Sequence, residues 1–493
     1  MVLDLTSTLA AVPPLDAAAS EYRSQVRSLL EHDTGSQIPL LVALDDDPTG
    51  TQTCHDVSVL TVWDVATLTA EFRRHTNAAA TSGQTPGFFI LTNSRALHPE
   101  PARQLIQEIC RHLQEASAAV GRSFEVVLRG DSTLRGHFPL EPEAVESVLG
   151  VADAWILCPF FLQGGRYTIS DVHYVAEKSE DGTSVLVPAA ETPFAKDATF
   201  GYKSSNLRDY VVEKSSGAIP AGHMTSISLD TIRQGGPGAI QTQLESLPTG
   251  RRNVVVINAA AEEDVDAVVM ALLKASCSKR FLFRTGAAFV SARLGIAPIE
   301  PISAAQLSLE KSPAGGLIIA GSYVPKTTAQ LDVLTTEHKP DVLTTVVINV
   351  DELLKSDDAA KEAVDKALAA AEESIAAGRD VLIMTSRRLV VGSDEAASLD
   401  IGATVARTLV SFLVQLKTKP RYVIAKGGIT SSDMATKGLN FRRALVVGQA
   451  APGVPLWRCD EPTCKWPGLP YVVFPGNVGS NETLSDVVKA WRS

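Results

Sequence analysis

The sequence is poor in the features that mark secreted, membrane-spanning and disulfide-bonded proteins. Its 493 residues contain six cysteines, which are scattered and lie partly within apolar runs, so we expect reduced, buried thiols. No run of about 18 apolar residues is present, which excludes a transmembrane helix. The N-terminal segment lacks a basic stretch followed by an apolar core, so we expect no secretory signal. These absences predict a cytoplasmic protein.

Several motifs of common enzyme classes are also missing. There is no Gly-x-x-x-x-Gly-Lys-Ser/Thr loop, which excludes a P-loop enzyme, and no Gly-x-Gly-x-x-Gly turn of a dinucleotide-binding unit. A Gly-x-Ser-x-Gly elbow is absent, so a hydrolase triad has no support. Cys459 and Cys464 are not followed by a second cysteine or histidine pair, so we expect no metal site. The net charge of −11 disfavours nucleic acid and anionic membranes as partners.

What is present predicts an α/β protein with two domains. A chain of 493 residues is longer than a domain with a single hydrophobic core usually is. Short β-branched runs alternate with segments whose apolar residues recur every three or four positions, which is typical of mainly parallel sheets flanked by helices. We expect a helical lead-in at 1–36, a first domain at 37–300, a second at 313–493 and a linker around 290–312. The active site is expected in a cleft between the domains.

The same patterns place individual elements. We expect strands at 40–44, 57–62, 88–91, 124–128, 155–158, 254–257, 316–320, 345–348, 381–384, 422–425 and 444–447. We expect helices at 101–116, 262–275, 358–377 and 396–416, and Gly378 should end the third of these. Residues 164–216 break the alternation with polar and turn residues, and long irregular insertions are often lids or binding loops.

Three consecutive carboxylates end the first expected strand of the sheet. Asp45, Asp46 and Asp47 follow an apolar run and precede a Pro-Thr-Gly turn. Burying one carboxylate is costly and three repel one another, so packing does not explain the cluster, although a solvent-exposed turn would. In open α/β sheets, ligands bind at this end of the strands. The cluster could accept a proton from a hydroxyl or hold a metal near phosphate, and the residues alone leave both uses open.

Polar residues follow three further strands. Arg95 follows one, Arg129, Asp131 and Arg135 follow the next, and Arg166 follows another. If the strands are parallel, these side chains gather at one edge of the sheet. Arginines bind carboxylates and carboxylates bind hydroxyls, so the mixture suits a polyhydroxylated carboxylic acid. The alternative is that Asp131 and Arg135 merely pair within one helical turn.

Glycine- and hydroxyl-rich turns follow strands of the second expected domain. They are Gly321-Ser322, the segment 426–432 and the segment 475–480. Glycines let backbone N–H groups approach an anion closely. Strand-to-helix turns favour glycine in any case, so these turns favour phosphate binding only moderately.

Together these motifs resemble the four-carbon acid sugar kinase family. The family's Asp-Asp-x-Thr-Gly, Asp-Ser-Thr-x-Arg-Gly and Gly-Gly-x-Thr-Ser motifs stand here in order at 46–50, 131–136 and 427–431. The likeness covers about residues 38–490. It implies an N-terminal domain that binds the acid sugar and a C-terminal domain that binds ATP. Known members phosphorylate threonate, erythronate or 3-oxo-tetronate at the terminal hydroxyl.

The resemblance also implies roles for single residues. Asp46, Asp47 and Asp131 are the candidates for accepting the hydroxyl's proton, and we do not choose among them, whereas Asp45 is expected to be dispensable to the chemistry. The implied substrate contacts are Asp47, Arg95, Arg129, Asp131, Ser132 and Arg135, with Arg95 and Arg129 expected to hold the substrate carboxylate. The implied nucleotide contacts are Ser322, Gly427, Gly428, Ile429, Thr430 and Gly476. The implied cofactors are ATP and Mg²⁺, the implied partners are small molecules, and the assembly could be a homo-oligomer.

The chain departs from the family pattern in two places. Many members have Lys-Ser-Gly-Asn-Phe-Gly where this chain has Phe474, Pro475 and Gly476 followed by Asn-Val-Gly, so a lysine that could touch phosphate is missing from that turn. Arg129 stands where the family usually has lysine, which could alter the preferred sugar. The alternative function is therefore a non-catalytic sensor of a sugar acid or nucleotide. An NAD-dependent sugar-acid dehydrogenase ranks below both, because its glycine fingerprint is absent.

Overall fold

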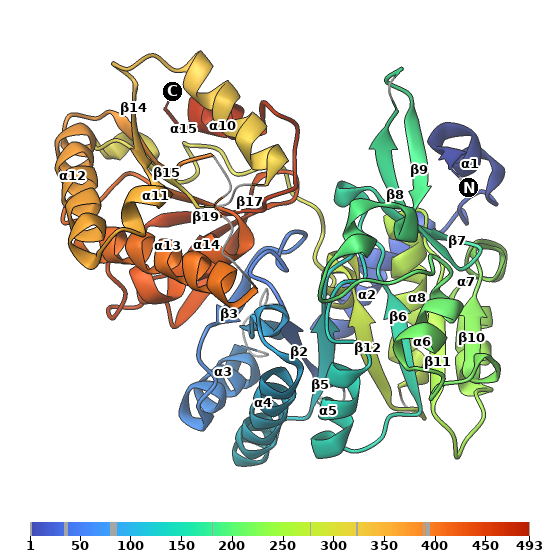
Figure 1. The fold of residues 1–493 in the computed structure, drawn as a ribbon. Coiled ribbons are helices and arrows are strands. Elements are labelled where there is room, and N and C mark those ends of the chain that lie inside the picture. Colours follow the sequence, from blue (N-terminus) through green and yellow to red (C-terminus); the bar gives the residue numbers. More distant parts are fainter. Residues whose placement is uncertain are drawn as a thin grey trace. The chain divides into compact units, whose positions relative to one another are not determined.

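The chain forms two compact units, Met1–Pro298 and Ile299–Ser493. The computed structural model describes residues 2–33, 38–78, 86–179, 181–276, 278–321, 324–387, 390 and 395–492. Both units combine helices with a mainly parallel sheet, so the predicted α/β fold class is confirmed (Figure 1).

The first unit is built on a parallel sheet with the strand order β10-β11-β6-β12-β5-β2-β4-β3. The strands are β2 (Leu40–Asp45), β3 (Val57–Leu60), β4 (Gly87–Leu91), β5 (Phe124–Arg129), β6 (Ala154–Cys158), β10 (Met224–Ile227), β11 (Asn253–Ile257) and β12 (Phe281–Thr285). The six strands predicted here are confirmed. β10 and β12 were not predicted, because threonine and serine in β10 and an arginine in β12 interrupt the apolar runs.

Helices cover both faces of this sheet, as buried parallel strands require. They include α2 (Tyr22–Glu31), α3 (Val65–Ala78), α4 (Pro99–Val120), α5 (Leu140–Leu149), α7 (Leu229–Glu245), α8 (Glu262–Ala275) and α9 (Ala287–Arg293). In α4, buried residues recur at the three- and four-residue intervals of one helical face, which explains the success of the sequence pattern there. The buried helix α9 occupies the beginning of the expected linker, so that part of the chain belongs to the first unit.

The insertion at 164–216 is more regular than the sequence suggested. It contributes β7 (Arg166–Ile169), β8 (Val172–Lys178), β9 (Ser184–Pro188) and α6 (Leu207–Lys214). With β1 (Leu3–Asp4) these strands form an antiparallel sheet in the order β1-β9-β8-β7. Figure 1 shows β8 and β9 as a projecting hairpin. These strands pair with one another outside the main sheet, which is why they break the strand–helix rhythm of the chain.

The second unit has its own sheet, with the order β17-β18-β19-β16-β13-β15-β14. Its strands are β13 (Leu317–Ala320), β14 (Leu343–Ile348), β15 (Asp380–Thr385), β16 (Val423–Lys426), β17 (Arg443–Ala451), β18 (Val454–Arg458) and β19 (Pro470–Phe474). Neighbours from β19 to β14 are parallel, and β17, β18 and β19 pair antiparallel. The five strands predicted by range are confirmed, β19 is the strand implied before the expected turn at 475–480, and β18 was not predicted.

The helices of the second unit are α10 (Pro325–Glu337), α11 (Val350–Leu353), α12 (Asp357–Ala376), α13 (Glu395–Gln415), α14 (Gly428–Asp433) and α15 (Thr483–Arg492). Gly378 follows α12 with φ = 74°, which confirms the predicted glycine at the helix end. Among the described helices of the chain, none is long and apolar enough to cross a membrane.

Two glycine substitutions in the second unit should change stability in opposite directions. Gly378→Ala should lower the free energy of unfolding by about 1 kcal/mol, because alanine is strained at a positive φ and its Cβ would lie 2.9 Å from the Pro313 carbonyl oxygen. Gly402→Ala, within α13 and with no atom within 4 Å of the added Cβ, should raise it by about 0.5–1 kcal/mol. Urea unfolding of both variants measures this. Equal shifts would contradict the assigned backbone conformations.

Candidate active site

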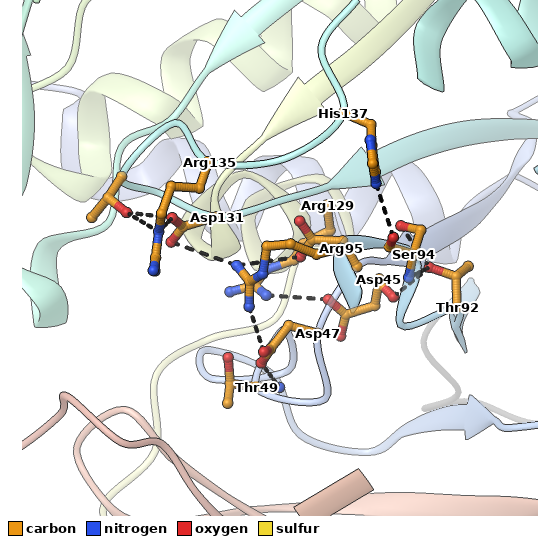
Figure 2. Close-up of polar contacts among 12 residues, drawn as sticks. Asp45, Asp47, Thr49, Thr92, Ser94, Arg95, Arg129, Asp131, Arg135 and His137 are labelled. Atoms are coloured by element: carbon orange, nitrogen blue, oxygen red, sulfur yellow. Dashed lines mark hydrogen bonds and ion pairs between the residues drawn. The ribbon is translucent and has the colours of Figure 1, made fainter. Parts of the chain in front are cut away.

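The polar residues predicted to share one edge of the first sheet do lie together. β2 is parallel to both β4 and β5, and Asp45 is in register with Leu91 on one side and with Arg129 on the other. The chain segments that follow these three strands therefore emerge at the same edge. Figure 2 shows their side chains converging there.

A row of alternating charges forms the centre of the site. Arg95 is ion-paired with Asp47, and its Nη1 lies 3.9 Å from one oxygen of Asp46 and 3.9 Å from one oxygen of Asp131. Asp131 in turn accepts a hydrogen bond from Nε of Arg135 at 2.6 Å. The predicted pairing of Asp131 with Arg135 is thus present, but it is one part of a larger cluster.

This cluster fixes the charge state of its members. Burial by itself would raise the pKa of Asp131, but Arg135 and Arg95 outweigh that effect and hold the pKa well below its usual range. Arg95 and the hydrogen bonds from Thr49 likewise hold the pKa of Asp47 below its usual value despite burial. Asp47 and Asp131 are therefore anions at neutral pH. Their low basicity suits them to orienting a hydroxyl more than to removing its proton.

Asp45 lies beneath this row and pairs with Arg129. The two side chains are 1% and 4% exposed, and Nη1 of Arg129 lies 3.1 Å from an oxygen of Asp45. Nη2 of Arg129 also donates to Oε1 of Gln52 at 3.2 Å. Burial raises the pKa of Asp45 to about 7, although Arg129 opposes the shift. The role predicted for Arg129 in holding a substrate carboxylate stays a prediction, since its guanidinium already has a buried counterion.

Asp46 differs from its neighbours in the hydrogen bonding of its carboxylate oxygens. It is 4% exposed, and within the described residues neither of its oxygens accepts a hydrogen bond. A second buried carboxylate, Glu141 in the first turn of α5, interacts electrostatically with it and accepts a hydrogen bond from Oγ of Ser94 at 2.5 Å. Burial, reinforced by the charge of Asp46, raises the pKa of Glu141 to about 7.

The insertion supports the loop that carries Asp131. His173, Tyr202, Tyr210 and Arg284 donate to the carbonyl oxygens of residues 132, 133, 134 and 135, at 2.7, 2.7, 2.9 and 3.1 Å respectively. Three of these donors come from the insertion and one from the end of β12. The loop therefore depends on a segment that the sequence suggested only as a lid or binding loop.

The charge state of His173 is part of this support. Its Nε2 faces the carbonyl of Ser132 and must carry a proton, while its Nδ1 lies 3.0 Å from Oγ1 of Thr168 and can accept. Burial lowers the pKa of His173 to about 4, so the ring is neutral at physiological pH. A neutral donor holds the loop without adding a charge to the site.

Two glycines, one in the first motif and one directly before the second, make room for charged side chains. A Cβ at Gly50 would lie 2.0 Å from an oxygen of Asp45, and one at Gly130 would lie 1.7 Å from Nη1 of Arg284. Any side chain at these positions would displace a buried ionic group. Close packing against these groups, more than turn geometry, explains why glycine stands there.

Two arginines at the site have no carboxylate partner within the part of the chain that the structure describes. Arg166 donates to the carbonyl oxygen of Gly164, and its guanidinium lies 5.5 Å from the ring centroid of Phe194. Burial lowers the pKa of Arg166, because Asp131 attracts its charge less than desolvation penalises it. Arg284 is 6% exposed and donates to a backbone carbonyl. Glu141 interacts electrostatically with Arg284, and Asp131 with Arg166, but neither arginine forms an ion pair with a described carboxylate.

In the second unit, three strand ends present the expected glycine turns. β13, β16 and β19 are parallel neighbours, so the turns after them share one edge. The N–H of Gly427 donates to the carbonyl of Phe474 at 2.8 Å, and Oγ1 of Thr327 donates to the carbonyl of Gly476 at 3.3 Å. A Cβ at Gly321 would lie 2.9 Å from Oγ1 of Thr430. Gly428 begins α14, and Ile429 is 69% exposed. Ser322 lies outside the described residues.

Sequence reasoning missed several residues of the first site. Glu141, His173 and Arg284 were not predicted, and Tyr202 and Tyr210 lie within an insertion that had no periodic pattern. An isolated glutamate near a helix start carries no signal of its own. Across the described residues, no group of three or more His, Cys, Asp or Glu side chains could hold a metal ion.

Comparison with known proteins shows what the chain resembles. A model described as a sugar-binding N-terminal domain matches residues 41–293, and one described as a nucleotide-binding C-terminal domain matches residues 317–484. The two matches fall in the first and second units respectively.

Individual relatives are distant. A D-erythronate kinase from Heliobacterium modesticaldum is 27% identical over 179 residues, which are 36% of this chain and 36% of that protein. The crystal structure of a putative tRNA synthase from Salmonella typhimurium LT2 has a TM-score of 0.63 at 15% identity, over 92% of this chain and 98% of that one. Haemophilus influenzae protein HI1011 has a TM-score of 0.57 at 14% identity, over 91% and 100%. These two structures share the fold.

The raised pKa of Glu141 predicts a measurable pH dependence of stability. Between the unfolded pKa near 4.5 and the folded pKa of about 7, the folded protein holds a proton that the unfolded chain has lost, so this group's contribution falls as pH rises through that window. Glu141→Gln should reduce the drop in the free energy of unfolding between pH 5 and pH 8, by about 2–3 kcal/mol.

Urea unfolding at the two pH values is the measurement. Glu143→Gln, on the same helix but with a half-exposed side chain that pairs with Arg252, is the matched control and should behave like the natural protein. An unchanged pH dependence in Glu141→Gln would contradict the assignment.

Proposed function

Because this chain belongs to the four-carbon acid sugar kinase family, we propose that it transfers the γ-phosphoryl group of Mg–ATP to a hydroxyl of a four-carbon sugar acid. Threonate, erythronate and 3-oxo-tetronate are the candidate substrates, and the terminal C4 hydroxyl is the proposed acceptor. The observation that carries the proposal is the row of alternating charges around Arg95, which lies in the unit that matches a sugar-binding domain. The similarity to a D-erythronate kinase supports it.

The charge distribution suggests how the substrate lies. On one side, the carboxylates of Asp46 and Asp47 border Arg95, whose own charge they already neutralise. On the other, Arg166 forms no ion pair with a described carboxylate. A substrate carboxylate added near Asp46 and Asp47 would be repelled, whereas near Arg166 it would compensate the charge of that guanidinium. We therefore place the substrate carboxylate toward Arg166 and its hydroxyl chain toward Asp46 and Asp47.

This orientation refines the roles expected from the sequence. Arg95 would hold Asp47 and Asp131 in place and bind substrate hydroxyl oxygens. Ser132 and Arg135 would contact the substrate between its carboxylate and its hydroxyl chain. Arg129, paired with Asp45 under the site, would support the position of Asp46 by fixing the end of β2. Asp45 is then needed for the site's geometry without touching the substrate.

Asp46 is the proposed acceptor of the proton. Its buried carboxylate oxygens receive no hydrogen bond from the described residues, so a substrate hydroxyl that reaches them would meet unused acceptors, while Asp47 and Asp131 are ion-paired with arginines. The hydroxyl oxygen forms a bond to the γ-phosphorus, the bond to the β,γ-bridging oxygen breaks with its electrons leaving on ADP, and the hydroxyl proton goes to Asp46. Such transfers depend mainly on positioning and charge neutralisation.

The second unit is proposed to hold the nucleotide. Backbone groups of residues 427–430 and of Gly476, together with Ser322, would contact the phosphates, as the resemblance implies. Mg²⁺ enters as part of the Mg–ATP substrate, where it neutralises charge on the phosphate oxygens. This assignment is supported by the match to a nucleotide-binding domain.

The proposal predicts that Asp46→Asn removes turnover and leaves the fold intact. With Mg–ATP and a panel of four-carbon sugar acids, the natural protein should release ADP with at least one acid. Asp46→Asn should lower kcat by roughly 10²–10⁴-fold, because the proton acceptor is lost. Thermal unfolding checks the fold, and Asp365→Asn, on the exposed side of α12, is the control.

The same assay separates the alternative function. Tight binding of an acid without ADP release by the natural protein would support a non-catalytic sensor. Normal turnover by Asp46→Asn would reject its role and leave Asp47 and Asp131 as the remaining candidates.

The proposed orientation predicts a loss of acid specificity in Arg166→Gln. Removing this guanidinium should raise KM for the preferred acid about 10- to 100-fold, the worth of one charge-assisted contact. The KM for ATP and any turnover of the matching uncharged polyol should stay unchanged, so the preference for the acid shrinks. Arg103→Gln, on the surface of α4, is the control. An equal loss for acid and polyol would show that Arg166 does not recognise the carboxylate.

A further inference from the structure

A buried lysine ends an inner strand of the second unit's parallel region. Lys426 is the last residue of β16 and is 0% exposed. It is in register with Phe474 on the neighbouring strand β19. Its Nζ lies 4.2 Å from the centroid of the Phe474 ring and donates to the carbonyl oxygen of Pro475 at 2.5 Å. The ring and the carbonyl hold the ammonium at the strand ends.

Within the described residues, this ammonium forms no ion pair with a carboxylate. Burial, and secondarily the like charge of Lys326 on α10, lower the pKa of Lys426 to about 7. An uncompensated cation is costly to bury, and an apolar side chain would fill the same space without that cost. A structural role alone therefore does not explain a lysine at this position.

The ammonium lies where two of the proposed phosphate-binding turns meet. Lys426 directly precedes Gly427, whose N–H donates to the carbonyl of Phe474, and its own Nζ contacts the turn that follows β19. The segment from Phe474 to Gly479 contains no basic residue. Lys426 is thus a cation supplied from the neighbouring strand to a turn that has none.

We propose that Lys426 binds the nucleotide polyphosphate and supplies the positive charge that the turn after β19 lacks. The inference rests on the proposed kinase function and adds a residue to its nucleotide site. A phosphate oxygen would provide the missing counterion, and the Phe474 ring would keep the ammonium in place as the site fills.

The test compares ligands that differ in phosphate number. Binding of Mg–ATP, Mg–ADP and adenosine is measured by calorimetry for the natural protein and for Lys426→Met, which keeps the length and apolar bulk of the side chain. We expect Lys426→Met to weaken Mg–ATP and Mg–ADP about 10- to 100-fold, the range for one hydrogen bond to a charged group, and to leave adenosine unchanged. Lys437→Met removes a 66%-exposed lysine that pairs with Asp433 and should change none of the three.

A measurement on the natural protein covers the case in which Lys426→Met does not fold. At pH 8 the free ammonium is partly deprotonated, so Mg–ADP should bind with the uptake of up to one proton, read from calorimetry in two buffers of different ionisation enthalpy. The charged group that acts on Lys426 is Lys326, while β13 and β19 present the uncharged Ala320 and Phe474 in register with it. Adenosine should bind without proton uptake.

The outcomes separate this inference from the function on which it rests. If the natural protein binds Mg–ATP, but Lys426→Met binds it equally well or weakens adenosine as much, Lys426 is structural and the inference is overturned. Binding of Mg–ADP without proton uptake would overturn it as well. If the natural protein binds neither Mg–ATP nor Mg–ADP, the proposed kinase function itself fails.

Discussion

The first site depends on the burial of opposite charges at the ends of three parallel strands. Arg95 is surrounded by Asp46, Asp47 and Asp131, and each carboxylate would be costly to bury without it. Parallel strands end at the same edge of the sheet. The residues that directly follow β2, β4 and β5 are therefore brought together at that edge. The row is nearly neutral as a whole, yet it leaves Asp46 with acceptor atoms to spare. The unused acceptor atoms of Asp46 would suit the proposed contact with a substrate hydroxyl.

Keeping such a row in one geometry requires support from other parts of the unit. The loop that carries Asp131 receives hydrogen bonds on four consecutive carbonyls, from the insertion and from β12. The buried pair of Asp45 and Arg129 fixes the base of the preceding turn. Neutral His173 and the two tyrosines add donors without adding charge, so the electrostatic balance of the row is left to its own members. The residues that hold the loop in place are therefore different from the residues that carry the charges of the row.

Among the described residues of the second unit, Lys426 shows the opposite arrangement, a buried cation that forms no ion pair. In the first unit, carboxylates already neutralise Arg95, whereas Lys426 is held only by a ring and a carbonyl. A site that is neutral when empty suits an uncharged group such as a hydroxyl, and one that is left positive suits a polyanion. The charges around Arg95 and around Lys426 therefore differ in compensation, as the proposed hydroxyl and phosphate contacts would require.

The sequence alone predicted the fold class and most strands. It also predicted that Asp46, Asp47, Arg95 and Asp131 lie together, because motifs at the ends of parallel strands share one edge of the sheet. It also located a turn without a lysine at Phe474. Only the tertiary structure decided the partners: Glu141 beside Asp46, the donors of the insertion on the loop, and Lys426 beside Phe474. These contacts join residues far apart in the chain, and strand register and burial, which no local pattern encodes, determine which groups meet and which charges stay uncompensated.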